Sequence, residues 1–308
     1  MMSASAAVGV MRAWSGPLPK GGATGATVSV EPLLGGEVQA PRAFFENPGG
    51  RFAKLRTLGV GTPRSKYVWA PVPAFLVTHP TIGPFLVDTA FHSSIAAKPA
   101  ANLGRTMSWA SKARVEPGRT ITAQLRERGI DNKQLGLVVL THMHFDHTSG
   151  IAEYPAATFV VSQREWEHAT TDDRPTLHGY NPAHFDYLFD YRTVDFDGPL
   201  ITSYANSFGR TFDLFGDGSV RLAYTPGHTP GHCSVICRLN DRDLVIAGDA
   251  IYTRAQLGGG DPPPAPADMH KWKRSLRELQ QFARTYPRAV IIPGHDADDW
   301  PTLEKRYE

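Results

Sequence analysis

Cysteine is scarce in this chain: only Cys233 and Cys237 occur among its 308 residues. If they lie on one strand, their separation is about 13 Å at roughly 3.3 Å per residue, too far for a disulfide. We therefore expect two small apolar core residues, and neither a disulfide scaffold nor a zinc finger.

Long hydrophobic runs and a charge excess are also absent. No stretch approaches the length of a transmembrane helix. Residues 6–11 are apolar but follow no basic residue, which makes a poor signal peptide. The formal net charge of +2 gives no reason to expect attraction to nucleic acid or to a membrane. These absences predict a cytoplasmic protein that uses neither as a partner.

The composition that is present, 41% hydrophobic and 20% charged, is that of an ordinary globular protein. Residues 1–25 are rich in Ala, Gly and Ser and are predicted to be a disordered tail. Residues 26–308 are predicted to form one domain, with an aromatic-rich insertion at about 170–208 that shows no clean period. Such an insertion either shapes a substrate pocket or forms a surface subdomain with its own small core.

The stretch 141–147 reads Thr-His-Met-His-Phe-Asp-His and carries four potential metal ligands within six residues. It follows an apolar run that is typical of a short buried strand. On an extended chain His142 and His144 point the same way, whereas Asp146 and His147 are adjacent and point apart, toward a second position. The pattern favours two metal ions side by side, with ligands that zinc, iron(II) and manganese(II) accept.

Three further donors, His228, Asp249 and His295, each follow an apolar run of their own. Four strands would then place polar side chains at their carboxyl ends, along one edge of the fold. Loops at the carboxyl ends of strands are where α/β proteins usually build their sites.

Together these residues resemble the metallo-β-lactamase superfamily of dinuclear metal hydrolases, over about the last two-thirds of the chain. The sequence pattern alone predicts only an α/β protein; the resemblance implies a four-layer αββα sandwich with the metals at one edge. It also implies two divalent ions, with Zn²⁺ favoured and Fe²⁺, Mn²⁺ or Co²⁺ as alternatives. The implied ligands are His142, His144 and His228 for one metal, Asp146, His147 and His295 for the other, and Asp249 as the bridge.

Two further residues are interpreted with the help of this resemblance. Asp88 ends an expected strand, so it is either a strand-end cap or a carboxylate that orients a metal-bound histidine; the family's pattern favours the second. His232 lies four residues after His228, but the family uses the first histidine as the ligand. We therefore interpret His232 as structural.

Within the superfamily, Tyr252 resembles a tyrosine of the N-acyl homoserine lactone lactonase branch. In that branch the tyrosine lies three residues after the bridging aspartate and contacts the lactone carbonyl. Phe145 fits the same branch, in which it borders the acyl-chain site, and so does the pattern that begins at Gly294. This chain departs from compact members of the branch by a longer N-terminal extension and a longer segment between His147 and His228. Both departures concern the acyl pocket.

The resemblance implies that a metal-bridging hydroxide opens the lactone ring. Tyr252 and one metal would stabilise the oxyanion, and Asp146 would carry the proton to the leaving ring oxygen. The alternatives are an organophosphate triesterase, another ester or thioester hydrolase of the superfamily, or a non-catalytic binding protein on this fold. The predicted partner is a small lactone, and a homodimer is left open.

Overall fold

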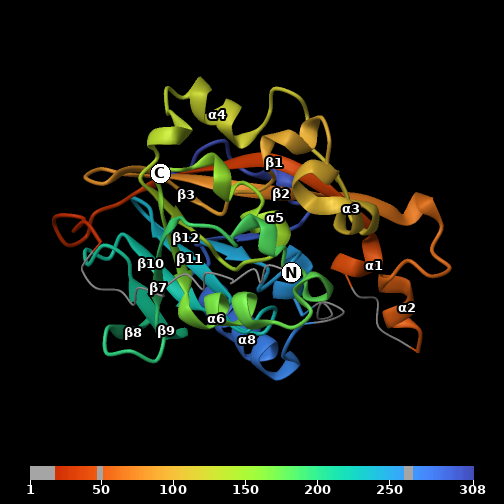
Figure 1. Cartoon of the computed structure of the whole chain (residues 1–308). Helices are drawn as coiled ribbons and strands as arrows, with labels where there is room; N and C mark the ends of the chain where they lie inside the picture. The colour runs from red at the N-terminus through yellow and green to blue at the C-terminus, as the bar shows by residue number, and fades with distance from the viewer. Residues whose placement is uncertain (1–17, 47–50, 260–265) are drawn as a thin grey trace.

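The computed structural model describes residues 18–46, 51–259 and 266–308. Two β-sheets form its centre (Figure 1). The first sheet contains, in spatial order, β4 (Lys112–Arg114), β1 (Ser29–Pro41), β2 (Tyr67–His79), β3 (Gly83–Val87), β5 (Leu137–Val139), β6 (Thr158–Ser162) and β7 (Asp190–Val194). The second contains β13 (Val290–Pro293), β12 (Asp243–Gly248), β11 (Cys233–Arg238), β10 (Val220–Tyr224), β9 (Phe208–Asp213) and β8 (Ile201–Tyr204).

Helices connect the strands and cover the outer faces. The α-helices are α1 (Arg42–Phe45), α2 (Ala53–Thr57), α3 (Ala100–Ala110), α4 (Ile121–Glu127), α5 (Phe145–Thr148), α6 (Gln163–Thr171), α7 (Arg254–Leu257) and α8 (Met269–Thr285). Single 3-10 turns are η1 (Arg64–Lys66), η2 (Ser93–Ala96), η3 (Asn132–Gln134), η4 (Ile151–Glu153), η5 (Pro175–His178), η6 (Pro182–His184) and η7 (Trp300–Thr302). Helix α4 lies at the top of Figure 1 and α8 at the bottom, on opposite sides of the paired sheets.

Alternating side chains on the strands divide the interior into separate hydrophobic layers. On β5, Leu137 and Val139 join the core between the sheets, whereas Val138 joins the core under the helices of the first sheet. On β12, Ile246 points into the core between the sheets and Val245 joins the core that includes α8. This alternation follows from the two-residue period of a strand. The predicted four-layer αββα sandwich is confirmed.

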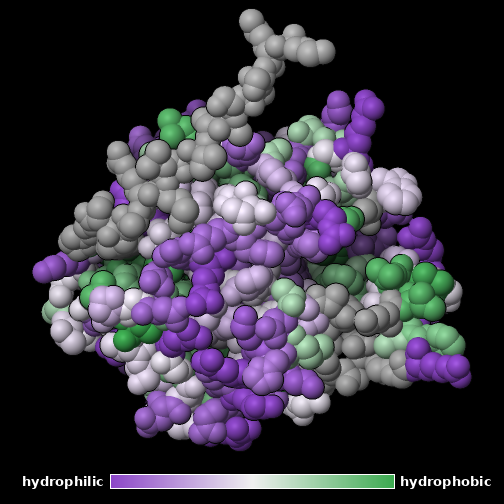
Figure 2. Space-filling view, turned by 60° about the horizontal axis from the view of Figure 1, so that its bottom comes forward, coloured by the Kyte–Doolittle hydropathy of each residue, from purple (hydrophilic) through white to green (hydrophobic). Residues whose placement is uncertain are grey.

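Helix α8 shows how the sequence fixes one outer layer. The carboxylate of Asp268 caps the helix by accepting from the backbone N–H groups of His270 and Lys271, each at 3.0 Å. Trp272 and Leu279 are among the side chains that bury its apolar face against the second sheet. The side of the molecule on which α8 lies is turned forward in Figure 2; it is mostly hydrophilic, with hydrophobic residues gathered near its edges.

The ends and insertions of the domain are partly built into the sheets. The first 17 residues of the predicted tail lie outside the described residues, whereas Gly21 and Gly25 donate backbone hydrogen bonds to Phe215 and Asp217. The 170–208 segment contains η5, η6, β7 and β8, so much of it is regular. Both cysteines are free and buried, as predicted. Among the described residues, no helix is both long enough and apolar enough to cross a membrane.

Candidate metal centre

Four strand ends meet at one edge of the sandwich. Strand β5 leads into the loop that carries His142 and His144, while β10, β12 and β13 lead to His228, Asp249 and His295. Strands β10, β12 and β13 run in the same direction, so their carboxyl ends lie on the same side of the second sheet. The predicted convergence of four strand ends is confirmed.

The chain turns into helix α5 at Phe145, directly after the first two histidines. Successive helical side chains differ in direction by roughly 100°, and Asp146 Oδ1 lies 4.0 Å from His147 Nε2. The other oxygen of Asp146 lies 3.5 Å from His295 Nε2. The prediction that Asp146 and His147 point apart is therefore wrong, because both side chains converge on one position with His295.

The seven donors fall into two groups. Within each group, one potential ligand atom per residue lies within 4.8 Å of all the others. The first group is His142, His144, His228 and Asp249, and the second is Asp146, His147 and His295. This division matches the one that the family resemblance implies.

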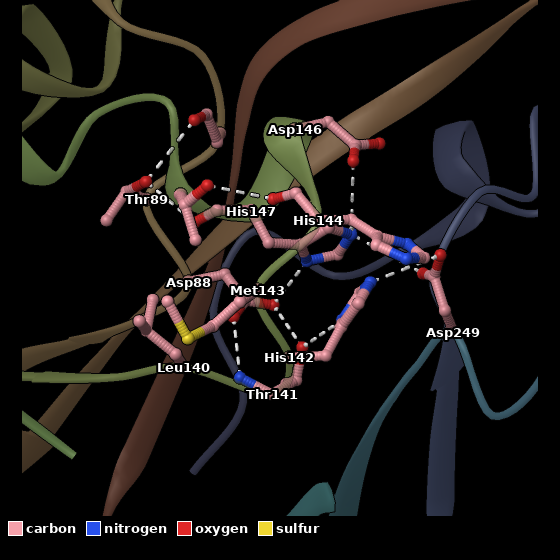
Figure 3. Close-up of polar contacts among 12 residues, drawn as sticks. Asp88, Thr89, Leu140, Thr141, His142, Met143, His144, Asp146, His147 and Asp249 are labelled. Carbon is pink, nitrogen blue, oxygen red and sulfur yellow. Dashed lines mark hydrogen bonds and ion pairs between the residues drawn. The ribbon is translucent and has the colours of Figure 1, made fainter. Parts of the chain in front are cut away.

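Asp249 has one carboxylate oxygen near each group, and Figure 3 shows this carboxylate pointing toward the histidine rings of the 142–147 segment. Its Oδ2 is 3.2 Å from His228 Nε2 and 3.7 Å from His142 Nε2. Its Oδ1 is 3.3 Å from His295 Nε2 and 3.5 Å from His147 Nε2. Each carboxylate oxygen thus faces a different group, which is the arrangement that a bridging ligand requires.

Each of the five histidines has a protein partner on its ring that lies outside the shared space. The pairs are His142 Nδ1 with Thr141 Oγ1 at 3.1 Å, His147 Nδ1 with Asp88 Oδ2 at 2.8 Å, His295 Nδ1 with the Pro71 carbonyl at 2.8 Å, His228 Nδ1 with the Tyr252 hydroxyl at 3.3 Å, and His144 with the His178 backbone. Such outer partners hold each imidazole in one orientation and leave its other nitrogen for a metal.

The inward atoms of the first group fit a cation. His228 Nε2 lies 3.2 Å from His142 Nε2 and 2.9 Å from His144 Nδ1, so three ring nitrogens crowd one point. Burial is the largest cause that lowers the pKa of His142 and His228, and it lowers the pKa of His144 to about 3. All three are therefore neutral imidazoles, the form that binds metal.

The second group also requires positive charge. Burial lowers the pKa of His147, but the carboxylates of Asp88, Asp146 and Asp249 outweigh it and leave the pKa well above its ordinary value. His147 Nε2 and Asp249 Oδ1 are buried and have no hydrogen-bond partner among the described residues. A divalent ion would supply the positive charge and coordinate the two atoms that lack hydrogen bonds, so the seven residues fit a dinuclear site.

Asp88 lies beside Thr141 and His147 (Figure 3). Its carboxylate accepts from the Thr141 backbone N–H, the Thr141 hydroxyl and the His147 ring, each at 2.8 Å. Asp88 is buried and has φ of +59°, an uncommon backbone conformation for a residue with a side chain. These contacts tie the end of β5 to a ring of the second group.

Tyr252 is buried beside the first group, with its ring centroid 5.5 Å from that of His228. If His228 presents Nε2 to a metal, its Nδ1–H donates to the phenol oxygen, and the phenol hydrogen remains available to another acceptor. Burial, followed by the charges of Asp249 and Asp146, raises the pKa of Tyr252 well above its ordinary value. The phenol is thus a hydrogen-bond donor at any ordinary pH.

Two sets of aromatic side chains lie next to residues of the centre. Phe145, which adjoins Asp146, is half-buried and stacks on Phe91 at 6.3 Å between ring centroids. Beside Tyr252, Phe44 stacks on its ring at 5.9 Å and Phe45 meets it edge-on at 5.9 Å. The two α1 residues were not predicted from the sequence, where their adjacency in the N-terminal extension is the only local signal.

The insertion reaches the metal centre through one short segment. Phe145 N–H donates to the Gly179 carbonyl at 2.9 Å, and the ring of Tyr180 lies 5.0 Å from that of His144. A Cβ on Gly179 would lie 2.9 Å from the His144 ring, so only glycine allows this approach. The aromatic residues farther along pack on the first sheet's outer core instead. The segment therefore contacts the metal centre near Gly179 and packs on the first sheet's core farther along, and a role in a substrate pocket stays a prediction.

His232 belongs to neither group of donors. Its Nε2 accepts from the Asp249 backbone N–H at 3.0 Å, and its Nδ1 lies 3.0 Å from Thr225 Oγ1. Both ring nitrogens thus have protein partners, and the residue fixes the backbone of Asp249. Within the insertion, the His178 ring pairs with the Asp172 carboxylate at 2.6 Å.

Comparison with known proteins places this architecture in a family. The sequence profile of the metallo-beta-lactamase superfamily matches residues 67–295. This protein belongs to the metallo-β-lactamase superfamily.

Individual relatives narrow the comparison. The chain is 32% identical over 270 residues to the N-acyl homoserine lactonase AttM of Azorhizobium caulinodans, covering 86% of this chain and 96% of that one. AttM of Agrobacterium fabrum is 31% identical over 243 residues, covering 77% and 86%. A solved structure of N-acyl homoserine lactone hydrolase with the product N-hexanoyl-L-homoserine bound superposes with a TM-score of 0.71 at 19% identity, covering 91% and 97%. The last similarity concerns the fold alone.

Proposed function

We propose that this protein is a dinuclear metallohydrolase that opens the lactone ring of N-acyl homoserine lactones or similar lactones. The observation that carries the proposal is Asp249, whose two oxygens face two separate groups of donors beside a protonated Tyr252. The AttM relatives, which are named N-acyl homoserine lactonases, support the substrate class.

The first metal would be held by His142, His144 and His228, the second by Asp146, His147 and His295, and both by Asp249. We propose Zn²⁺ because the ligands are imidazoles and carboxylates, with Fe²⁺, Mn²⁺ and Co²⁺ as alternatives that the same donors accept. When bound, two such ions supply Lewis-acid activation of a water molecule and of a carbonyl group.

Tyr252 would donate a hydrogen bond to the lactone carbonyl oxygen. That oxygen gains negative charge as water adds to the carbonyl carbon, so the bond strengthens toward the transition state. The phenol is positioned for this role because Phe44 and Phe45 pack against its ring and His228 Nδ1 contacts its oxygen.

Asp146 would accept the proton of the attacking water and pass it to the ring oxygen when the carbon–oxygen bond of the lactone breaks. The product is then an N-acyl homoserine, with one new carboxylate and one new hydroxyl group. Asp146 is buried at the second group of donors, within 3.5 Å of His295 Nε2. Phe145 and Phe44 would border the acyl chain.

A hydrolysis screen with the purified, metal-loaded protein tests the proposal. Its substrates are homoserine lactones of increasing chain length, simple γ- and δ-lactones, a phosphotriester and a glutathione thioester. We expect kcat/KM to be far higher for lactones than for the phosphotriester, and higher for longer acyl chains. A wide margin in favour of the phosphotriester would instead establish a triesterase, and no hydrolysis at full metal content would establish a binding protein.

Three finer statements remain predictions with their own measurements. Elemental analysis of protein purified without chelator identifies the native metal, which we expect to be zinc at about two ions per chain. Cell fractionation tests the cytoplasmic location. Sedimentation of the purified protein tests for a homodimer.

A further inference from the structure

Glu165, on helix α6, is a fully buried carboxylate outside both groups of metal donors. Within the described residues, no ion pair with a basic side chain reaches it. Burying an ionised carboxylate without a cationic partner costs several kcal/mol unless hydrogen bonds replace the lost water. The hydrogen-bond partners of Glu165 therefore indicate its structural role.

The two oxygens of Glu165 hold two different loops. Oε1 accepts from the Met143 backbone N–H at 2.9 Å, and Oε2 accepts from the Gly231 backbone N–H at 3.0 Å. Met143 lies between His142 and His144, and Gly231 lies three residues after His228. One loop follows a strand of the first sheet and the other a strand of the second, so Glu165 joins the two sheets at the metal edge.

The approach of the second loop is unusually close. A Cβ on Gly231 would lie 2.1 Å from the backbone nitrogen of Glu165, so a larger residue would push the loop away. The Tyr180 hydroxyl also donates to Glu165 Oε1, at 3.3 Å, while the Tyr180 ring packs against His144. Helix α6, the insertion and both ligand loops thus meet at one carboxylate.

The three potential metal ligands on these loops, His142, His144 and His228, all belong to the first group of donors. The second group is held differently, through Asp88 on His147 and the Pro71 carbonyl on His295. We propose that Glu165 is a positioning residue that sets the geometry, and thereby the affinity, of the metal position formed by His142, His144 and His228. The proposal depends on the proposed metal ligands and not on the lactone substrate.

The chemistry of the contact suggests the substitution Glu165→Gln. Two backbone N–H groups require two acceptor oxygens, and a glutamine amide offers one oxygen and one NH₂ group. The amide oxygen can therefore accept from the backbone N–H of one ligand loop. The amide NH₂ group would face the backbone N–H of the other loop, and two donors cannot form a hydrogen bond. Its volume is nearly unchanged, so packing of α6 is preserved.

Competition between the protein and a coloured chelator for Zn²⁺, repeated with Co²⁺ to read its visible absorption, tests the proposal. In Glu165→Gln we expect one of the two ions to bind about 10- to 100-fold more weakly, as for other residues that orient ligands, and the other ion to bind as before. Excess metal should restore hydrolysis. The matched control is Glu167→Gln, an exposed residue of the same helix that bonds Gln163, which should change neither affinity.

Wild-type affinity for both ions in Glu165→Gln would overturn the proposal, as would equal weakening of both. A loss of thermal stability that is the same with and without metal, and no change in affinity, would also assign Glu165 to general packing. If Glu165→Gln does not fold, Tyr180→Phe removes only the hydroxyl donor and keeps the ring against His144. It should weaken the same ion by a few-fold, and unchanged binding would then refute the proposal. The titration uses no substrate, so its result is independent of the lactonase assignment.

Discussion

The metal centre and a second cluster, His79 with Asp217 and Ser219, are built from similar residue types and are similarly buried. In the second cluster, His79 Nε2 bonds Asp217 at 2.9 Å, and His79 Nδ1 accepts from two backbone N–H groups. The other Asp217 oxygen accepts from the Ser219 backbone and hydroxyl groups. His79 ends β2, eight residues and about 26 Å of strand beyond Pro71, which contacts the metal centre.

The difference between the two clusters lies in the atoms that remain unpaired. Every ring nitrogen of His79 has a hydrogen-bond partner, whereas His147 Nε2 and Asp249 Oδ1 have no hydrogen-bond partner among the described residues. Buried polar groups are nearly always paired in folded proteins. A buried His-Asp cluster whose bonds are complete is therefore structural, and one whose inner atoms converge unpaired is built to hold an ion.

Asp249→Ala should have the largest effect, because it removes the carboxylate that faces both groups of donors. We expect kcat/KM to fall by more than about 10³-fold, beyond the roughly 10²–10³ of a single electrostatic donor, and at least one ion to be lost. Elemental analysis and lactone hydrolysis are the measurements. Two tightly bound ions in this variant would contradict the bridging position of Asp249.

Asp217→Asn should instead damage stability and leave the metal centre intact. The amide cannot accept from both His79 and Ser219, so we expect the free energy of unfolding to fall by about 3 kcal/mol. Denaturant unfolding measures the loss, and metal content per folded chain is the control. Loss of an ion at unchanged stability would remove the distinction between the clusters.

The loss of stability in Asp217→Asn should depend on pH. Burial opposes ionisation of Asp217, but hydrogen bonds from Ser219 and His79 outweigh it and hold the pKa below the ordinary 3.8. A lowered folded-state pKa means that the stabilisation is present above the ordinary pKa and is lost as pH falls through the folded value. The stability difference between the wild type and Asp217→Asn should therefore shrink below about pH 4.

Tyr252→Phe should have an intermediate effect on activity. The ring keeps its packing against Phe44 and Phe45, and only the hydroxyl is lost. Removing one oxyanion donor costs roughly 10²–10³ in kcat; since a metal shares the charge, we expect about 10- to 100-fold, with KM changing less. Because the hydroxyl also contacts His228 Nδ1, the assay must be run at saturating metal. Full activity there would leave Tyr252 as a packing residue.

Phe44→Ala should have the smallest effect and should depend on the substrate. The side chain is 36% exposed and covers one face of the Tyr252 ring. Losing an aromatic contact of about 0.5–1.5 kcal/mol corresponds to roughly 2- to 10-fold in kcat/KM, and we expect the loss to grow with acyl-chain length. Phe52→Ala, at a more exposed position, is the control. An equal loss for short and long chains would place the acyl chain elsewhere.

The sequence by itself determined which residues are candidate donors. Short apolar runs before His142, His228, Asp249 and His295 predict strand ends, because a buried strand requires consecutive apolar residues that can be recognised in the local sequence. The spacing of the motif residues supplied the family resemblance. The resemblance implied the fold, the division of the donors between two metals, a bridging place for Asp249 and roles for Asp88 and Tyr252.

Only the tertiary structure decided how those donors are oriented and supported. Helix α5 brings Asp146 and His147 together where an extended chain would separate them. Glu165 and Gly179 meet the centre from segments with no periodic relation to the motifs, so nothing local in the sequence marks them, and Phe44 is signalled only by its aromatic neighbour. The physical reason is that strand ends follow from neighbouring residues, whereas the partner of each ring nitrogen and carboxylate oxygen follows from how distant segments pack.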